Sequence, residues 1–270
     1  MSADPGGDPQ TLLSLAVDLA QQAGRLVEEL RDGAVRAGET KSSLTDHVTE
    51  ADRAAERAII AGILATRPDD AILGEETSAR DGTSGVRWVI DPIDGTTNFV
   101  YGIPAYAVSI AVERDGQVVA GVVHDPVAPC TYTATRGGGA ARDGRPIRCS
   151  TRTELATALI GTGFSYLAAR RAQQARLLAE LLPRVRDIRR FGAASLDLCA
   201  VASGRLDAYY EHGLQPWDLA AGWLIAHEAG AVVGDLRGGD PSSEHLVAAA
   251  PALFEPLVGL LVGAGALDVT

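Results

Sequence analysis

Two aspartates three residues apart, followed by a Gly-Thr-Thr-Asn segment, are the residues of this sequence best suited to chemistry. Asp91 and Asp94 carry hard carboxylate oxygens that suit Mg²⁺, an ion that usually takes one or two carboxylates together with water and phosphate oxygens. Gly95 would let the backbone approach an anion closely, and the amides of residues 96–98 would open a helix whose N–H groups face a phosphate. A plain Pro-Asp-Gly turn is the competing interpretation of the same residues.

The flanking sequence predicts where these two aspartates lie. Residues 87–90 alternate in character and include β-branched side chains, which indicates a short buried strand. Pro92 cannot donate to a β-ladder, so we expect it to end that strand. Asp91 and Asp94 would then occupy the turn beyond the strand end.

Three further acids lie at the ends of predicted elements. Glu75 follows a short apolar strand, and Asp52 lies in the first turn of a capped helix. Asp218 comes directly after Pro216 and Trp217, at the start of an almost entirely apolar helix that we expect to be buried. Asp52 and Asp218 would complement the positive ends of their helices in any case. For Asp218 an equally good alternative is a ligand held rigidly over a site.

Convergence of these acids would need a counter-charge. Two carboxylates ~4 Å apart repel by roughly 4 kcal/mol at an effective dielectric constant of about 20. Shared protons or divalent cations resolve such repulsion, and ligands that are all oxygen favour Mg²⁺ over zinc. If Glu75, Asp91, Asp94 and Asp218 meet, the sequence therefore predicts a magnesium site.

Helical and strand patterns alternate along the whole chain, which predicts an α/β or α+β fold with layers of helix and sheet. The Asp115-Gly116 pair predicts a hairpin turn in a mainly antiparallel first sheet. The helices are expected at residues 12–32, 49–67, 167–182, 192–203, from 216 onward, and as a buried terminal helix within 251–267. The strands are expected at residues 71–73, 87–90, 106–113, 118–123, 130–135, 157–161, 185–190, 206–210, 232–235 and 245–249.

Length and composition are those of an ordinary globular protein. The 270 residues are 46% hydrophobic and 22% charged, with a net charge of −11 that argues against general affinity for nucleic acid. Three cysteines without CxxC spacing suggest neither a disulfide framework nor a zinc cluster, and a reducing cytoplasm fits best. We expect no secretory signal and no membrane span. The predicted organisation is a mobile tail at residues 1–10 and one domain at 11–270, with halves of about 11–150 and 151–270.

The order of motifs resembles that of the inositol monophosphatase family, over a region from about Leu12 to the C-terminal helix. A lone DPxDGT is a moderate signal, whereas GEE upstream and WDxAxG downstream make the set specific. The motifs that carry the resemblance are Lys41-Ser42-Ser43, Val48-Thr49-Glu50-Ala51-Asp52, Gly74-Glu75-Glu76, Trp88 to Phe99, Gly192-Ala193-Ala194, Ala208-Tyr209-Tyr210-Glu211 and Trp217-Asp218-Leu219-Ala220-Ala221-Gly222.

The resemblance implies a five-layer αβαβα sandwich of the sugar-phosphatase type, usually a homodimer. It also implies hydrolysis of phosphate monoesters with two or three Mg²⁺ ions, commonly inhibited by Li⁺. Residues 11–150 would hold the metals and phosphate, and residues 151–270 would select the substrate.

Site roles follow from the matching motif positions. Glu75, Asp91 and the Ile93 carbonyl would hold one metal, and Asp91, Asp94 and Asp218 a second. A third, weaker ion would reach Glu75 through water. The catalytic group would comprise Glu75 and Thr96, which orient the attacking water, Asp52 as the partner of Thr96, and Lys41 as a nearby cation. The substrate contacts would come from Asp94, Gly95, Thr96, Gly192, Ala194 and Glu211.

The main functional hypothesis is a Mg²⁺-dependent inositol-1-phosphate phosphatase, because Glu211 with Gly192-Ala193-Ala194 resembles the inositol-binding pattern. The alternatives are other phosphate esters, namely fructose 1,6-bisphosphate, NADP or histidinol phosphate. A second class of hypothesis is an interaction protein of RNA processing or transcription, since bacterial relatives of the extragenic-suppressor type are associated with those complexes.

Overall fold

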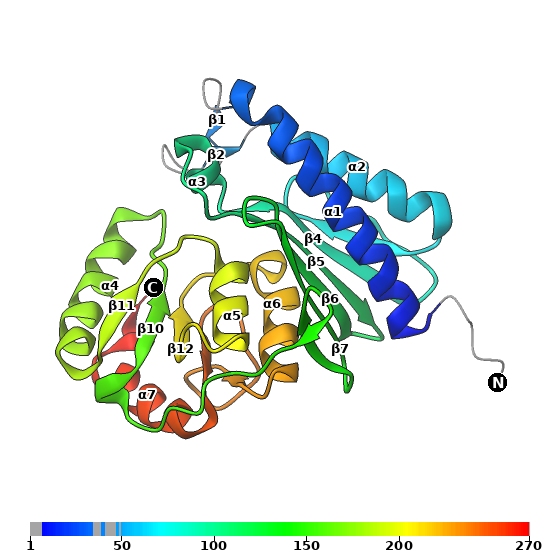
Figure 1. The fold of residues 1–270 in the computed structure, drawn as a ribbon. Coiled ribbons are helices and arrows are strands. Elements are labelled where there is room, and N and C mark those ends of the chain that lie inside the picture. Colours follow the sequence, from blue (N-terminus) through cyan, green and yellow to red (C-terminus); the bar gives the residue numbers. More distant parts are fainter. Residues whose placement is uncertain (1–6, 35–38, 41–46, 49, 270) are drawn as a thin grey trace.

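The computed structural model describes residues 7–34, 39–40, 47–48 and 50–269. Its elements stack in five layers, helix, sheet, helix, sheet and helix, which Figure 1 shows from the upper right to the lower left. The predicted layered sandwich is thereby confirmed.

The first sheet has seven strands in the order β3-β4-β5-β6-β7-β8-β9. Only β3 and β4 run parallel, and the other neighbours are antiparallel. Asp115 and Gly116 both have positive φ in the β5–β6 hairpin, as that turn requires. The strands are β3 (Ala71–Gly74), β4 (Val86–Asp94), β5 (Ala107–Arg114), β6 (Gln117–Asp125), β7 (Cys130–Thr135), β8 (Gly139–Arg142) and β9 (Arg145–Pro146). A separate pair joins β1 (Glu39–Thr40) to β2 (His47–Val48).

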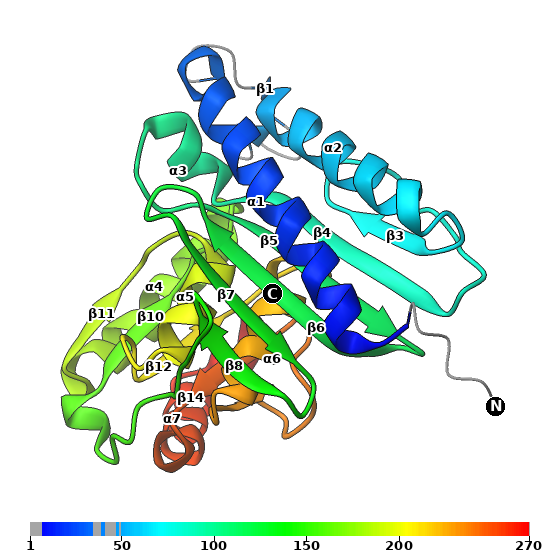
Figure 2. The ribbon, with the colours of Figure 1, turned by 45° about the vertical axis from the view of Figure 1, so that its right-hand side comes forward.

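Two long helices cover one face of this sheet. α1 (Pro9–Ala34) and α2 (Glu50–Thr66) lie side by side over β4 to β7, as both ribbon views show (Figure 2). Their apolar stripes, which include Leu19 and Ile59, pack on Trp88 and Ile110, all of them nearly inaccessible to solvent. The opposite face packs on α5 (Ala194–Ala202) and α6 (Pro216–Glu228), the apolar helix that was expected to be buried.

The second sheet lies beyond α5 and α6, with strand order β11-β10-β12-β14-β13. Two helices, α4 (Ala168–Leu181) and α7 (Pro251–Gly263), cover its outer face. The strands are β10 (Leu159–Thr162), β11 (Asp187–Arg189), β12 (Ala208–Glu211), β13 (Val232–Gly234) and β14 (Leu246–Ala249). The short helices are α3 (Thr96–Tyr101) and the 3₁₀ turns η1 (Leu155–Thr157), η2 (Leu182–Arg184) and η3 (Ala266–Asp268).

The prediction that Pro92 ends its strand is wrong. β4 continues to Asp94, and its pairing with β5 shifts register between Asp91, opposite Ser109, and Asp94, opposite Ala107. Two residues therefore bulge out against one, and the bulge accommodates a proline that has no N–H to donate. Asp91 and Asp94 thus lie on the strand itself, so the ladder fixes their backbone more firmly than a turn would.

Three other expectations need correction. α1 begins at Pro9, so the last two residues of the predicted tail are helical. β8 and β9 were not expected. The terminal helix is only half buried, because α7 turns Leu253, Leu257 and Leu261 inward while several of its other residues are exposed. Within the described residues, no helix is long and apolar enough to cross a lipid bilayer.

Candidate active site

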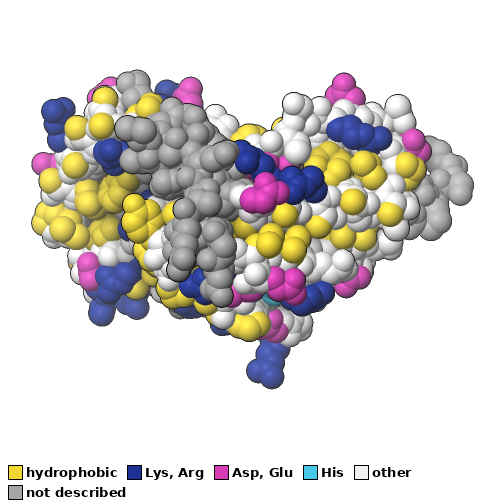
Figure 3. Space-filling model, turned by 90° about the horizontal axis from the view of Figure 1, so that it is seen from above, with side chains coloured by type: hydrophobic (Ala, Val, Ile, Leu, Met, Phe, Trp, Pro, Cys, Tyr) yellow, Lys and Arg dark blue, Asp and Glu magenta, His cyan; other side chains and the backbone are white. Residues whose placement is uncertain are grey.

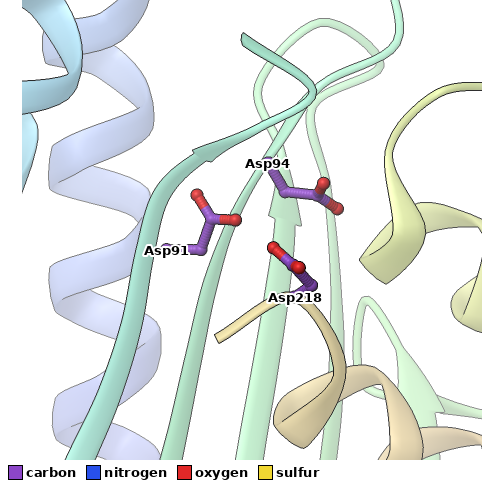
Figure 4. A group of neighbouring side chains, drawn as sticks. All are labelled: Asp91, Asp94 and Asp218. Atoms are coloured by element: carbon purple, nitrogen blue, oxygen red, sulfur yellow. The ribbon is translucent and has the colours of Figure 1, made fainter. Parts of the chain in front are cut away.

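Three aspartates from distant parts of the chain meet at the end of β4. One carboxylate oxygen each from Asp91, Asp94 and Asp218 lies within 4.8 Å of the others. Figure 4 shows the three side chains close together, two from the strand and one from the start of α6. This is the geometry of an oxygen-lined cation site.

Each carboxylate is held by backbone N–H groups. Asp91 Oδ1 accepts from the Ile93 amide at 3.0 Å, and Asp218 Oδ2 accepts from the Gln215 amide at 2.6 Å in the capping box of α6. Asp94 uses both oxygens. Oδ1 accepts from the Ala194 amide at 3.2 Å, while Oδ2 accepts from the Ser195 amide at 2.7 Å and from the Ser195 hydroxyl. Asp94 therefore joins β4 to the first turn of α5.

Glu75 reaches the same cluster from β3. Its amide donates to the Ile90 carbonyl at 3.1 Å, directly before Asp91 on β4, and its carboxyl lies against that of Asp91. The four acids predicted to converge are therefore neighbours.

Burial, and for Asp91 and Asp218 also the neighbouring acids, disfavours the charged forms of the three aspartates. Burial raises the pKa of Asp91 well above its usual value, and the nearby Glu75, Asp94 and Asp218 raise it further. Burial likewise raises the pKa of Asp218, and the nearby Asp94 raises it further. Burial also raises the pKa of Asp94, although the hydrogen bonds from Ser195 lower it in part. Across the described ranges, none of the three aspartates has a Lys, Arg or His ion-pair partner. A hard divalent cation fits this donor set and would remove the repulsion.

A cavity of about 520 Å³ opens over the cluster. Its walls contain ten of the predicted site residues, namely Glu75, Asp91, Ile93, Asp94, Gly95, Thr96, Gly192, Ala194, Glu211 and Asp218. Two others do not line it. Asp52 lies behind the wall on α2, and Lys41 is outside the described residues.

Thr96 has its proton committed to the protein. Its Oγ1 lies within donating distance of two acceptors, Asp52 Oδ1 at 3.2 Å and the Ile93 carbonyl at 3.0 Å. The hydroxyl proton donates to one of these oxygens, so a lone pair remains to accept a hydrogen bond from water in the cavity. Next to it Gly95 has φ of 93°, and a Cβ there would lie 2.9 Å from the Ala105 carbonyl. Only glycine fits this position.

Glu211 forms another part of the cavity wall. Its carboxylate accepts from the Tyr209 hydroxyl, and burial raises its pKa to about 7. A Cβ on Gly163 would lie 2.0 Å from Glu211 Oε2, so this glycine leaves room for the carboxylate. Arg190 also lines the cavity, whereas Arg189 pairs with Asp187 at 2.7 Å. The basic run at 184–190 is thus divided between site and surface.

Sequence reasoning missed three residues around the site. Ser195 anchors Asp94. Asp197 is a buried acid on α5. Burial and the nearby Glu211 raise its pKa to about 9. Glu56 is completely buried on α2. The available signal for Asp197 is an acid within an apolar helical run.

Comparisons with known proteins agree with this geometry. The inositol monophosphatase family matches residues 8–264. The inositol-1-monophosphatase SuhB of Mycobacterium tuberculosis is 47% identical over 280 aligned positions, which cover 95% of both chains. The Nus factor SuhB of Pasteurella multocida is 41% identical over 92% of this chain and 94% of its own. The crystal structure of the extragenic suppressor protein suhB from Bartonella henselae superposes with a TM-score of 0.88 at 38% identity, covering 93% of this chain and 98% of that one. The chain therefore belongs to the inositol monophosphatase family and is a phosphoric monoester hydrolase.

Proposed function

We propose that this enzyme hydrolyses myo-inositol 1-phosphate to inositol and phosphate in a Mg²⁺-dependent reaction. The observation that carries the proposal is the meeting of Asp91, Asp94 and Asp218, three buried carboxylates without an ion-pair partner among the described residues, with the Glu75 carboxyl beside Asp91. In keeping with the family, we also propose inhibition by Li⁺ and a homodimer.

The residues divide the work between metal, phosphate and water. We assign Glu75, Asp91 and the Ile93 carbonyl to one ion, and Asp91, Asp94 and Asp218 to a second. A third ion would reach Glu75 through water. Bound Mg²⁺ would supply the positive charge that phosphoryl transfer needs and would acidify a water molecule.

The protein groups position the reactants around these ions. The amides of Gly95 and Thr96 would bind phosphate oxygens. The Thr96 hydroxyl, whose proton is committed to Asp52 or Ile93, would accept a hydrogen bond from the attacking water and orient it. Glu75 would share that role. Lys41 is proposed as a further cation near the phosphate.

Selection of the alcohol is assigned to Glu211, Gly192 and Ala194. Replacing Glu211 by Gln keeps an acceptor for Tyr209 but removes the charge that binds sugar hydroxyls. We expect the KM for inositol 1-phosphate to rise about tenfold, since a hydrogen bond to a charged group contributes about 1.5 kcal/mol or more. Hydrolysis of p-nitrophenyl phosphate, which has no sugar hydroxyls, should change less than about twofold.

A phosphate-release panel measures this under one set of Mg²⁺ conditions. It compares inositol 1-phosphate with p-nitrophenyl phosphate, fructose 1,6-bisphosphate, NADP and histidinol phosphate. The proteins are the wild type, Glu211→Gln and the surface control Glu255→Gln. Slower turnover of inositol 1-phosphate than of the other three substrates would overturn the substrate assignment and leave the reaction class intact.

An interaction role in RNA processing or transcription is the second candidate, favoured by the name of the Pasteurella relative, a Nus factor. The charge of −11 argues against direct nucleic-acid binding. In the described part of the face in Figure 3, acidic and basic side chains are interspersed, without a broad basic field.

Asp218→Asn separates the two candidates. The phosphatase proposal predicts that this variant loses hydrolysis and any cellular phenotype together. A pull-down with intact and variant protein, alongside complementation of a deletion strain, measures both. A phenotype and partners that survive complete loss of hydrolysis would favour the interaction role.

A further inference from the structure

α2 places two buried carboxylates one helical turn apart against the active site. Asp52 and Glu56 are four residues apart, so they lie on the same face of the helix, and both are 0% exposed. Asp52 is already accounted for by its contact with the Thr96 hydroxyl. Glu56 neither lines the cavity nor belongs to the aspartate cluster.

Glu56 supports the segment that carries Glu75. Its Oε1 accepts from the Glu76 amide at 3.1 Å, directly after Glu75 in the chain. On the other side, the Glu75 amide donates to the Ile90 carbonyl of β4 at 3.1 Å. Hydrogen bonds to the neighbouring strand and to α2 therefore both hold this segment.

This support matters because β3 is a short edge strand. It has four residues and pairs with β4 alone among the strands of its sheet. Without the bond from Glu56, the turn after β3 would lose its hydrogen bond to α2. The direction of the Glu75 carboxyl would then be less well defined.

The contact also explains the glycine before Glu75. A Cβ at Gly74 would lie 2.0 Å from Glu56 Oε1 and 2.7 Å from its carboxyl carbon. The carboxylate therefore lies directly against the backbone of residue 74. Burying an acid costs free energy unless hydrogen bonds compensate for it. We therefore expect the completely buried Glu56 to hold the neighbouring backbone in place.

We propose that Glu56 is a positioning residue, which aims the Glu75 carboxylate at the metal site by holding the Glu76 amide. The inference rests on the proposed role of Glu75 as a Mg²⁺ ligand. Partners that orient a ligand typically contribute 10- to 100-fold to metal affinity or activity.

The test compares Glu56→Ala, Glu56→Gln and Glu56→Asp. Ala removes the acceptor, Gln keeps an oxygen at the same reach, and Asp keeps the charge but is one methylene too short. Glu50→Ala is the control, because Glu50 is an exposed acid on the same helix that pairs with Arg57. Mg²⁺ binding is measured by calorimetry and by the rise in Tm on adding Mg²⁺, beside KM and kcat.

We expect Glu56→Ala and Glu56→Asp to raise the Kd for Mg²⁺ about 10- to 100-fold. The KM for inositol 1-phosphate at saturating Mg²⁺ should stay nearly unchanged. Glu56→Gln and Glu50→Ala should bind Mg²⁺ within about threefold of wild type, since the acceptor oxygen is retained or was never involved. If Glu56→Ala does not fold, the test is the comparison of Mg²⁺ affinity between Glu56→Gln and Glu56→Asp.

The outcomes separate this inference from the proposed function. Wild-type Mg²⁺ affinity in a folded Glu56→Ala protein would overturn the role of Glu56 only. Rescue by Asp and failure of Gln would do the same, because charge rather than reach would then matter. A wild-type protein that neither binds Mg²⁺ nor needs it for hydrolysis would defeat the proposed function itself.

Discussion

Asp91→Asn should abolish Mg²⁺-dependent hydrolysis and, in the absence of metal, make the protein more stable. Asp91 is assigned to both ions, so loss of its charge should lower kcat by roughly 10³-fold or more, the upper range for removing one electrostatic contact with a transition state. Stability should move the other way. The side chain is buried beside three other acids, and neighbours as well as burial disfavour its charged form. Asn has nearly the same shape, keeps an oxygen for the Ile93 amide and can donate to Glu75.

The stability gain should be modest because shared protons already relieve part of the repulsion. We expect about 1 kcal/mol, or a Tm roughly 2–4 °C above wild type in EDTA. Thermal unfolding with EDTA and with Mg²⁺ measures it. Added Mg²⁺ should raise the Tm of the wild type strongly and that of Asp91→Asn weakly.

The pH dependence gives an internal control for the same variant. The folded-state pKa of Asp91 is raised, so its neutral form is favoured and the penalty for folding is absent below its ordinary value of 3.8. The penalty grows as pH rises above that value through the folded pKa. The advantage of Asp91→Asn in EDTA should therefore be present at pH 7.5 and shrink toward pH 4. Near-normal turnover, or an advantage independent of pH, would contradict the assignment of Asp91.

The elements were largely predictable because hydrophobic periodicity and turn residues are local. Cys130 to Thr135 and the Asp115-Gly116 hairpin are placed in the structure as the pattern indicates. β4 shows where such a local rule fails, because the strand continues past Pro92 to Asp94. Proline ends a strand only when the partner strand needs its N–H, and the bulge at Pro92 and Ile93 removes that need. No feature of residues 86–94 alone announces such a bulge.

The sequence was enough to pick out the acids of the site, but not the residues that hold those acids in position. Carboxylates at element ends drew attention to Asp91, Asp94 and Asp218, but their meeting depends on tertiary packing and was supplied by family resemblance. The supports lie far away in sequence. Ser195 bonds to an aspartate 101 residues before it, and Glu56 bonds to an amide 20 residues after it. Both are common residues in helices, so only the folded structure shows what they hold.

Asp94→Asn should also abolish hydrolysis, yet it should destabilise the metal-free protein, in contrast to Asp91→Asn. Both oxygens of Asp94 accept hydrogen bonds from the first turn of α5, from Ala194 and from Ser195. An amide in its place must turn its NH₂ group toward an N–H donor in either orientation. Leaving a buried donor unpaired costs about 1–3 kcal/mol, which should outweigh the relief of repulsion.

Measuring the Tm in EDTA distinguishes the two aspartates directly. The Asp94→Asn protein should unfold at least about 2 °C below wild type, because each kcal/mol corresponds to roughly 2–4 °C at this chain length. Ser195→Ala is the matched control. It removes the hydroxyl donor and keeps the carboxylate and both amides, so it should lose less stability and retain most of its turnover. If Asp94→Asn proved as stable as Asp91→Asn, Asp94 would be only a charge in the cluster. A lower Tm for Asp94→Asn than for Asp91→Asn would show that Asp94 has two roles. Its side chain would contribute to the metal site and would also join β4 of the first sheet to α5, in the helix layer between the two sheets.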